Sequence, residues 1–182
     1  AGIGTLGLVD YDRVDLSNLQ RQILHSTEDV GRQKVASAEE KLNRLNPEVE
    51  IRTLAVRLEE RNATEILAAY DFIVDGSDNF PTKFLVNDTA VKLGIAFNHA
   101  GIVRLQGQTM TVIPGKSACY RCLFKEPPPP EEILSCQQAG ILGAVAGMST
   151  PACGGPDARE LPPSPKLVHP NAERLAELRA DL

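Results

Sequence analysis

Three observations predict an α/β fold for this chain of 182 residues, with a doubly wound, mostly parallel sheet and helices on both faces. Short apolar runs alternate with amphipathic segments of about 12 to 15 residues, as βαβ crossovers require. Polar clusters follow two of the apolar runs, at the strand ends where such sheets bind ligands. Hydrophobic residues make up 42% and charged residues 24%, a balance typical of one globular domain rather than of disorder, a coiled coil or a fibre.

The first half of the predicted fold contains two strands and one helix. Residues 5–9 are an apolar run that suits a strand buried on both faces, and a polar loop follows at residues 12–18. From residue 32 to residue 46 apolar side chains recur at helical spacing, and Asn46-Pro47 ends this helix. Residues 49–53 alternate with charged neighbours, which predicts a half-exposed strand.

Five further elements, two helices and three strands, complete the predicted fold. A short helix capped by Asn62 runs to residue 69, and residues 71–74 form the next buried strand. A helix over about residues 82–93 and a strand over residues 95–98 follow. Residues 107–113 alternate as a last strand, which we expect to be antiparallel to the others or separate from them.

The last part of the chain has a different composition. Pro127 to Pro130 form a run of prolines that we expect to be extended. Residues 149–165 are rich in Pro, Gly and small residues, which predicts a loop or a disordered segment before a short polar helix. We therefore divide the chain into a folded domain, residues 1–147, and a divergent or disordered, irregular Pro/Gly-rich C-terminal tail, residues 148–182.

Charge and hydropathy exclude several classes of partner. Lys plus Arg number 19 against 24 Asp plus Glu, so a net charge of -5 offers no basic field for nucleic acid or an anionic membrane. Any anion site must therefore be local. No apolar run approaches the roughly 18 to 20 residues of a membrane span, and the chain opens without a secretory signal. We expect a cytoplasmic protein.

A cluster of polar side chains follows the first strand. It contains a carboxylate at the strand end, then hydroxyl, amide and guanidinium groups, and a lysine near the next helix: Asp10, Ser17, Asn18, Gln20, Arg21 and Lys34. A strand-end carboxylate accepts both ribose hydroxyls of a nucleotide, while Arg21 and Lys34 suit phosphate oxygens. The alternative is a solvated loop with ion pairs.

A second cluster, Asp75-Gly-Ser-Asp78-Asn79, follows the strand at residues 71–74. Its hard oxygens are of the kind that Mg²⁺ takes alongside phosphates. The alternative is that Ser77 or Asp78 caps the next helix. Because the carboxyl ends of parallel strands meet at one edge of the sheet, we expect both clusters to converge on a single crevice.

The third cluster is Cys119-Tyr-Arg-Cys122. Its spacing supplies two of the four ligands that a tetrahedral zinc site needs. A redox dithiol, or two plain thiols, are the alternatives. Four cysteines without a secretory signal favour a metal or redox role in a reducing compartment over structural disulfides.

These clusters belong to a longer series of motifs: Gly4 to Asp10, Asp15 to Gln22, Val30 to Lys34, Leu45 to Pro47, Asp75 to Asn79 and Cys119 to Cys122. In this order and spacing they closely resemble the ThiF/MoeB/HesA family, which are adenylyltransferases of sulfur-carrier proteins related to ubiquitin-activating enzymes. The resemblance runs from residue 1 to about residue 147. It implies a Rossmann-like fold, and a homodimer in the full-length protein.

The resemblance implies ATP-dependent adenylation of the C-terminal Gly-Gly carboxylate of a small ubiquitin-like sulfur-carrier protein, with release of pyrophosphate. Asp10 would hold the ATP ribose and Lys34 would meet the phosphates. Asp78 with Asn79 would serve Mg²⁺ and the reacting centre. The nucleotide and its phosphates would be lined by Ser17, Asn18, Gln20 and Arg21.

The resemblance also assigns roles to the cysteines. Cys119 and Cys122 would be two of four Zn²⁺ ligands, an incomplete set, and Cys136 matches a cysteine that some members use for a thioester or persulfide step. The catalytic residues implied are then Arg21, Lys34, Asp78 and Cys136.

The residue types fit the physics of that reaction. A carboxylate that attacks an α-phosphate brings one anion up to another, so the site must supply positive charge and fix the line of attack. The attacking carboxylate is already ionised near pH 7, so no acid/base pair is needed. We therefore expect His25, His99 and His169 to be structural or exposed.

The sequence departs from the family pattern in three places. The Gly-rich phosphate loop and an N-terminal arm are expected upstream of Ala1, so we interpret the chain as an N-terminally truncated member. Lys83 stands where members often carry Arg, which replaces a planar fork by a point charge. The second CxxC motif is missing, and neither Cys136 nor Cys153 restores its spacing.

Two other functions remain open. A truncated homologue could bind the carrier or dimerise without catalysis. An NAD-dependent oxidoreductase shares the strand-end carboxylate, but gives no reason for Arg21 together with Lys34 and Asp78. Pyrophosphate exchange that depends on an added carrier separates the three.

Overall fold

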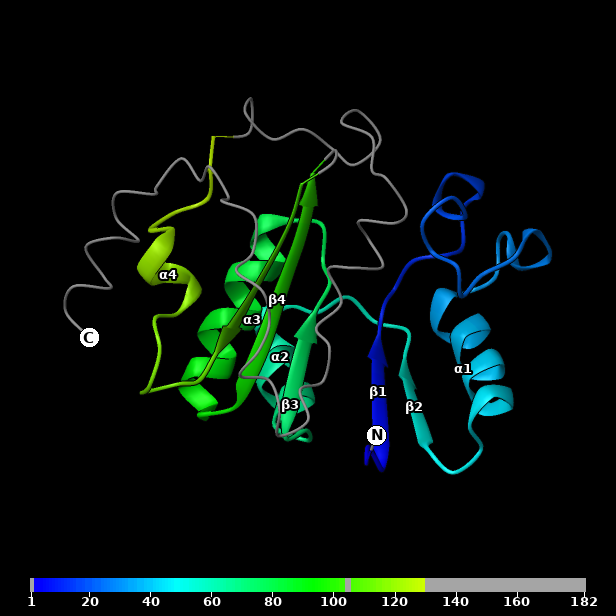
Figure 1. The fold of residues 1–182 in the computed structure, drawn as a ribbon, viewed down its shortest axis with the longest axis horizontal. Helices are drawn as coiled ribbons and strands as arrows, with labels where there is room; N and C mark the ends of the chain where they lie inside the picture. The colour runs from blue at the N-terminus through cyan, green and yellow to red at the C-terminus, as the bar shows by residue number, and fades with distance from the viewer. Residues whose placement is uncertain (1, 104–105, 130–182) are drawn as a thin grey trace, which may run out of the picture.

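The computed structural model describes residues 2–103 and 106–129; Cys136 of the predicted domain and the whole predicted tail, with His169, lie outside this part of the chain. The elements follow one another as β1 (Thr5–Val9), α1 (Lys34–Leu45), β2 (Glu50–Leu54), α2 (Glu60–Leu67), β3 (Phe72–Asp75), α3 (Phe80–Leu93), β4 (Ala96–Val103), β5 (Gln106–Val112) and α4 (Tyr120–Leu123) (Figure 1). This alternation confirms the predicted α/β class.

The strands form two hydrogen-bonded ladders. β1 and β2 pair in parallel from Thr5 opposite Glu50 to Val9 opposite Leu54. β3 pairs with β4 in parallel, and β4 pairs with β5 in the antiparallel sense, as predicted for the last strand. Within the described residues the two ladders are not hydrogen-bonded to each other.

The order of the strands reverses between β1 and β3. From β1 the chain passes through α1 to β2, and α2 then brings it back to β3, from which α3 leads to β4 on the other side. Figure 1 shows the four strands β1 to β4 pointing the same way, with β1 and β3 as the inner pair. Their carboxyl ends therefore lie at one edge, as a doubly wound sheet requires.

One apolar core lies between α2, α3 and the ladder of β3, β4 and β5. Its buried members are Leu67, Ile73, Val86, Ala90, Phe97 and Val112. Alternate residues of β3 point into this core, so Ile73 and Asp75 are buried while Phe72 and Val74 are exposed. α1 packs against β2, and buries Val35 and Ala38.

Local hydrogen bonds move two helix starts from their predicted positions. α1 begins at Lys34 rather than at residue 32, because Gln33 is extended and pairs with Arg13 in an isolated bridge. α2 begins at Glu60 with Glu59 as its cap, whereas Asn62 was the predicted cap. Asn62 contributes from the first turn instead, where its side-chain oxygen accepts a hydrogen bond of 2.8 Å from the Glu59 N–H.

Two elements are longer than predicted. α3 begins at Phe80 rather than at residue 82, because Asn79 accepts a hydrogen bond from the Thr82 N–H (2.9 Å) and Pro81 fits the first turn. The helix ends at Gly94, whose φ of 72° suits glycine. β4 continues to Val103, beyond the predicted end at residue 98, because β5 folds back and pairs with it.

A close approach in β1 requires glycine. The ring of Tyr70, just before β3, lies where a Cβ at Gly7 would be. We expect Gly7→Ala to lower the free energy of unfolding by about 1 kcal/mol, because the half-buried ring of Tyr70 must move to admit the added methyl group. Urea denaturation measures the change. Gly4→Ala is the control, since a Cβ there meets nothing within 4 Å; equal destabilisation by both substitutions would contradict the prediction.

Candidate active site

The turn after β1 brings Asp10 and Lys34 together. Asp10 continues the ladder, since its N–H donates to the Leu54 carbonyl (3.2 Å), and its Oδ1 accepts the Asp12 N–H (2.8 Å). Lys34 opens α1, and its Nζ lies 2.9 Å from Asp12 Oδ2 and 3.7 Å from Asp10 Oδ2. The predicted ribose carboxylate and the predicted phosphate cation are therefore neighbours, and Asp12 is a third member that the sequence analysis did not name.

The next turn, η1 (Leu16–Asn18), is held by its own side chains. Asp15 Oδ1 accepts hydrogen bonds from the Ser17 N–H (2.8 Å) and hydroxyl (2.5 Å), and Asn18 Oδ1 accepts the Asp15 N–H. The two bonds from Ser17 lower the pKa of the exposed Asp15 carboxyl. Arg21 follows directly, and its Nη1 donates to the Ser17 carbonyl (3.1 Å). Ser17, Asn18 and Arg21 thus share one compact turn.

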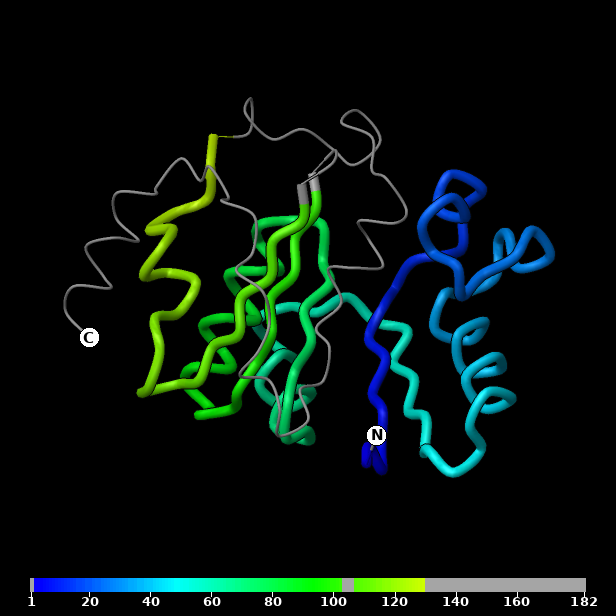
Figure 2. Tube along the Cα trace, viewed as in Figure 1, coloured from blue at the N-terminus to red at the C-terminus, as the bar shows by residue number. Residues whose placement is uncertain are grey.

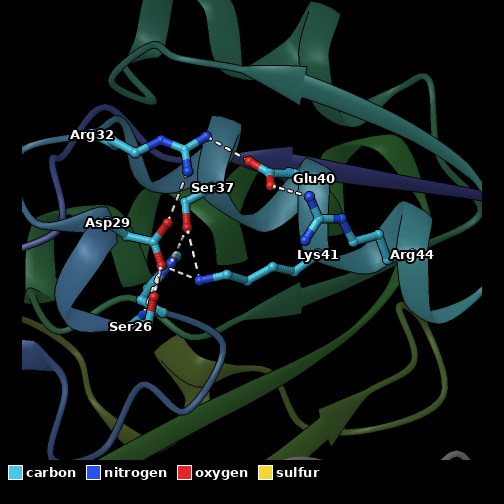
Figure 3. A network of polar contacts seen from close by, with 8 residues as sticks. Ser26, Asp29, Arg32, Ser37, Glu40, Lys41 and Arg44 are labelled. Carbon is cyan, nitrogen blue, oxygen red and sulfur yellow. Dashed lines mark hydrogen bonds and ion pairs between the residues drawn. The ribbon is translucent and has the colours of Figure 1, made fainter.

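The segment between β1 and α1, whose path Figure 2 traces, is anchored by a buried carboxylate. Asp29, in η2 (Thr27–Asp29), is 2% exposed and accepts hydrogen bonds from the Ser26 N–H (2.7 Å) and hydroxyl (2.8 Å). Arg32 Nη1 donates to it at 2.9 Å, and Lys41 of α1 donates to its other oxygen. Figure 3 shows these donors converging on Asp29, with Glu40 joining Arg32 to Arg44.

This network lowers the pKa of Asp29 far below that of an ordinary carboxyl. The hydrogen bond from Lys41 is the largest cause, followed by the Ser26 N–H, and together they outweigh the opposing effect of burial. The sequence analysis missed Asp29, although Ser26 followed three residues later by an acidic residue is a capping-box signal. The network ties η2 to α1 and so limits movement of the segment that carries Arg21.

The turn after β3 contains the second cluster. Asp75 is 4% exposed, so its carboxylate is not available to a metal ion in the way that the hard-oxygen interpretation of this motif assumed. It accepts hydrogen bonds from His99 Nδ1 (2.8 Å) and from the Ser77 N–H (2.9 Å). Asp78 is exposed. Capping occurs, but the cap of α3 is Asn79 rather than Ser77 or Asp78.

Lys83 and His99 complete a buried polar group around Asp75. Lys83 Nζ lies 3.7 Å from Asp75 Oδ2 and donates to the Ala100 carbonyl (2.8 Å). Burial raises the pKa of Asp75, but the His99 hydrogen bond, the Lys83 charge and the Ser77 bonds outweigh it, so the pKa is lowered. The His99 ring packs against Tyr120, and burial with the charge of Asp75 raises the pKa of Tyr120 to about 12. No sequence spacing could have joined residues 75 and 99.

The other described histidine is also packed inside. His25 Nδ1 lies 3.0 Å from the Ser37 hydroxyl, beside the Asp29 network. Burial and then the charge of Lys41 lower its pKa, so His25 is neutral near pH 7. His25 and His99 are thus both structural in their contacts, and neither is exposed.

Cys119 and Cys122, at the start of α4, form no disulfide, and their Sγ atoms are 3.7 Å apart. Burial raises the pKa of Cys119, but hydrogen bonds from Cys122 and from the Arg121 backbone outweigh it and lower the pKa. Among the described residues, no three His, Cys, Asp or Glu side chains are grouped as metal ligands. Cys136 lies outside these residues.

The first two clusters occupy the same edge of the fold. Asp10 follows the carboxyl end of β1 and residues 76–79 follow the carboxyl end of β3, the two strands between which the order reverses (Figure 1). A doubly wound sheet binds ligands at this point. Across the described residues, no helix has the length and apolarity needed to cross a membrane.

We expect Asp29→Asn to weaken the fold in a pH-dependent way. Because the pKa of Asp29 is lower in the folded state than its unfolded value of about 4, the ionised carboxylate stabilises the fold above that pH. This stabilisation disappears as pH falls through the folded pKa. The variant should have a lower Tm at pH 7 and a shallower loss of Tm between about pH 5 and pH 2.

Thermal unfolding followed by circular dichroism at several pH values makes this measurement. Glu48→Gln, which removes the charge of an exposed acidic residue in the turn between α1 and β2, is the control and should follow the parent protein throughout. A Tm profile for Asp29→Asn that stays parallel to that of the parent down to about pH 2 would rule out the Asp29 network as the source of the acid sensitivity.

Comparison with known proteins adds a family profile and several relatives. The ThiF family profile matches residues 1–154. The chain is 47% identical over 150 residues to a sulfur carrier protein adenylyltransferase of Thermus thermophilus, covering 80% of this chain and 55% of that protein. It is 45% identical over 149 residues to the adenylyltransferase and sulfurtransferase MOCS3 of Culex quinquefasciatus, covering 81% and 34%. The chain therefore spans about half, or less, of these relatives.

Solved structures have the same fold. The structure of E. coli MccB with MccA-N7isoASN matches with a TM-score of 0.70 at 24% identity, covering 81% of this chain and 46% of that chain. A structure of PaaA matches with a TM-score of 0.61 at 26% identity, covering 81% and 46%. The MccB likeness supports the Rossmann-like architecture predicted above.

Proposed function

Because the chain belongs to the ThiF family, we propose that it is the nucleotide-binding part of an ATP-dependent adenylyltransferase for a small ubiquitin-like sulfur-carrier protein. The reaction joins the C-terminal Gly-Gly carboxylate of the carrier to the α-phosphate of ATP and releases pyrophosphate. Relatives named as sulfur carrier protein adenylyltransferases support this activity. The observation that carries the proposal is the reversal between β1 and β3, with a polar turn at the carboxyl end of each strand.

The turn after β1 supplies the nucleotide contacts. Asp10 would accept the ribose hydroxyls, and Ser17, Asn18 and Gln20 would line the nucleotide. Lys34 lies between two carboxylates, 2.9 Å from Asp12 and 3.7 Å from Asp10. A triphosphate carries more charge than either carboxylate, so it would draw the ammonium group away from Asp12 toward the phosphates.

Positive charge accounts for the catalysis. The attacking carboxylate and the α-phosphate repel each other, and Arg21 and Lys34 would offset that repulsion in a crevice where water is scarce. Mg²⁺, when bound, neutralises phosphate charge, and the exposed Asp78 carboxylate offers the hard oxygen that this ion prefers. Asn79 already caps α3, so its side chain serves the site by fixing the end of the turn.

The cysteine pair suits a structural zinc ion. Zn–S bonds of about 2.3 Å in a tetrahedron place two sulfur atoms about 3.8 Å apart, and Cys119 and Cys122 are 3.7 Å apart. Two further ligands would come from outside the described residues. Cys136, also outside them, is proposed for a thioester or persulfide step. A cytoplasmic homodimer without nucleic-acid or membrane partners completes the proposal.

Exchange of radioactive pyrophosphate into ATP tests the function directly. With an added carrier that ends in Gly-Gly, the protein should catalyse exchange, and Arg21→Ala should reduce the rate by about 10²- to 10³-fold by removing phosphate-directed charge. Arg61→Ala, which removes an exposed guanidinium on α2, is the control and should retain the parent rate.

The other results of this assay separate the alternatives. Binding of the carrier without exchange would overturn the enzymatic proposal and favour the non-catalytic homologue, and reduction of NAD would favour the oxidoreductase. Full activity in Arg21→Ala would remove Arg21 from the site, whereas circular dichroism should show that the substitution leaves the fold intact.

A further inference from the structure

The turn at residues 76–79 is fastened at both of its ends. At its end, Asn79 caps α3 through a 2.9 Å bond from the Thr82 N–H. At its start, Asp75 Oδ1 accepts the Ser77 N–H at 2.9 Å, which closes the turn on the strand that precedes it. Between these two anchors Gly76 and Asp78 are exposed, whereas Ser77 is half-buried. The direction in which Asp78 points therefore depends on where the Asp75 carboxylate sits.

Two side chains from other elements hold that carboxylate. His99 of β4 donates from Nδ1 to Asp75 Oδ2 at 2.8 Å, and Lys83 of α3 places its Nζ 3.7 Å from the same oxygen. Lys83 is itself held by the Ala100 carbonyl at 2.8 Å, and the His99 ring packs on Tyr120 with 4.4 Å between the ring centroids. Together, the contacts from His99 and Lys83 restrict rotation of the Asp75 carboxylate.

Stability alone does not explain this buried polar group. Asp75, Lys83 and His99 are 4%, 7% and 2% exposed, and His99 Nε2 is buried without a hydrogen-bond partner among the described residues. Burying a charged pair and an unsatisfied nitrogen is unfavourable compared with packing apolar side chains in the same volume. The group instead fixes the orientation of the Asp75 carboxylate, because each hydrogen bond restricts the angle as well as the distance of its partner.

We propose that Lys83 and His99 are positioning residues of the nucleotide site: by holding Asp75, they fix the turn at residues 76–79 and the direction in which Asp78 faces the nucleotide. The role rests on the proposed adenylation, since it assigns Asp78 to Mg²⁺ and ATP. Neither residue touches the nucleotide. The proposal also gives the buried Lys83 a role, because its ammonium group reaches both Asp75 and the Ala100 carbonyl within the core.

The test compares disruptive and conservative variants in the full chain. Lys83→Met and His99→Leu remove the groups that hold Asp75, whereas Lys83→Arg and His99→Asn keep a cation and a side-chain N–H donor at these positions. Thr111→Val is the matched control, because it breaks a 3.0 Å bond from Asn98 of the same strand β4 without touching Asp75. Thermal unfolding of every variant shows how much general stability each substitution removes.

The first measurement needs no activity. Amide hydrogen exchange at Ser77 should be about tenfold faster or more in Lys83→Met and His99→Leu than in Thr111→Val at matched stability, because local opening of the turn no longer breaks a fixed bond. Lys83→Arg and His99→Asn should restore slow exchange. If Ser77 exchange rises only as much as amide exchange in β4, the proposal is overturned, since the change would then be a general loss of stability.

The second measurement uses pyrophosphate exchange. The disruptive variants should raise KM for Mg-ATP by about tenfold or more, because a misplaced site residue weakens productive binding, and the conservative variants should recover most of it. Unchanged KM with fast Ser77 exchange would overturn the positioning role. If the parent protein catalyses no exchange, the adenylation proposal fails, while the Ser77 measurement still decides whether Lys83 and His99 hold the turn.

Discussion

A buried carboxylate must be surrounded by donors, and this requirement organises both turns at the ligand-binding edge. Asp29 and Asp75 are nearly inaccessible, and each collects hydrogen bonds from a backbone N–H of its own turn and from side chains of a packed helix or strand. Leaving either unpaired would be strongly unfavourable, so the surrounding chain has little freedom to rearrange. The segment after β1 and the turn after β3 are thereby held to the scaffold.

The residues proposed to contact the nucleotide are more accessible to solvent than Asp29 and Asp75. Ser17 and Asp78 are exposed, and the side chains of Asp10 and Lys34 are 38% and 13% exposed. Exposed polar side chains on turns have few packing contacts that fix their orientation. Buried partners must therefore hold the turns in place. The division between buried anchors and exposed contacts is what a preorganised phosphate site needs, because charges that are already in place cost little to reorganise during the reaction.

The two halves of the site depend on topology rather than on direct contact. α2 carries the chain from β2 back to β3, which places the turn after β3 at the same edge as the turn after β1. Parallel strands and right-handed crossovers leave few other arrangements. This is why residues as far apart in sequence as Asp10 and Asp78 can be considered for one ligand, and why the fold supports the family assignment independently of sequence identity.

The sequence by itself determined the class of fold and the order of its elements, and it singled out candidates such as Asp10 and Lys34, because periodicity and strand-end position are local properties of the chain. Asp29 was within reach of a local signal, the serine three residues before it. Only the tertiary structure decided that Asp75 turns inward, that Asn79 is the cap and that His99 and Lys83 meet one carboxylate. These contacts depend on which side chains, distant in sequence, pack together, and this packing cannot be derived from the spacing of residues along the chain.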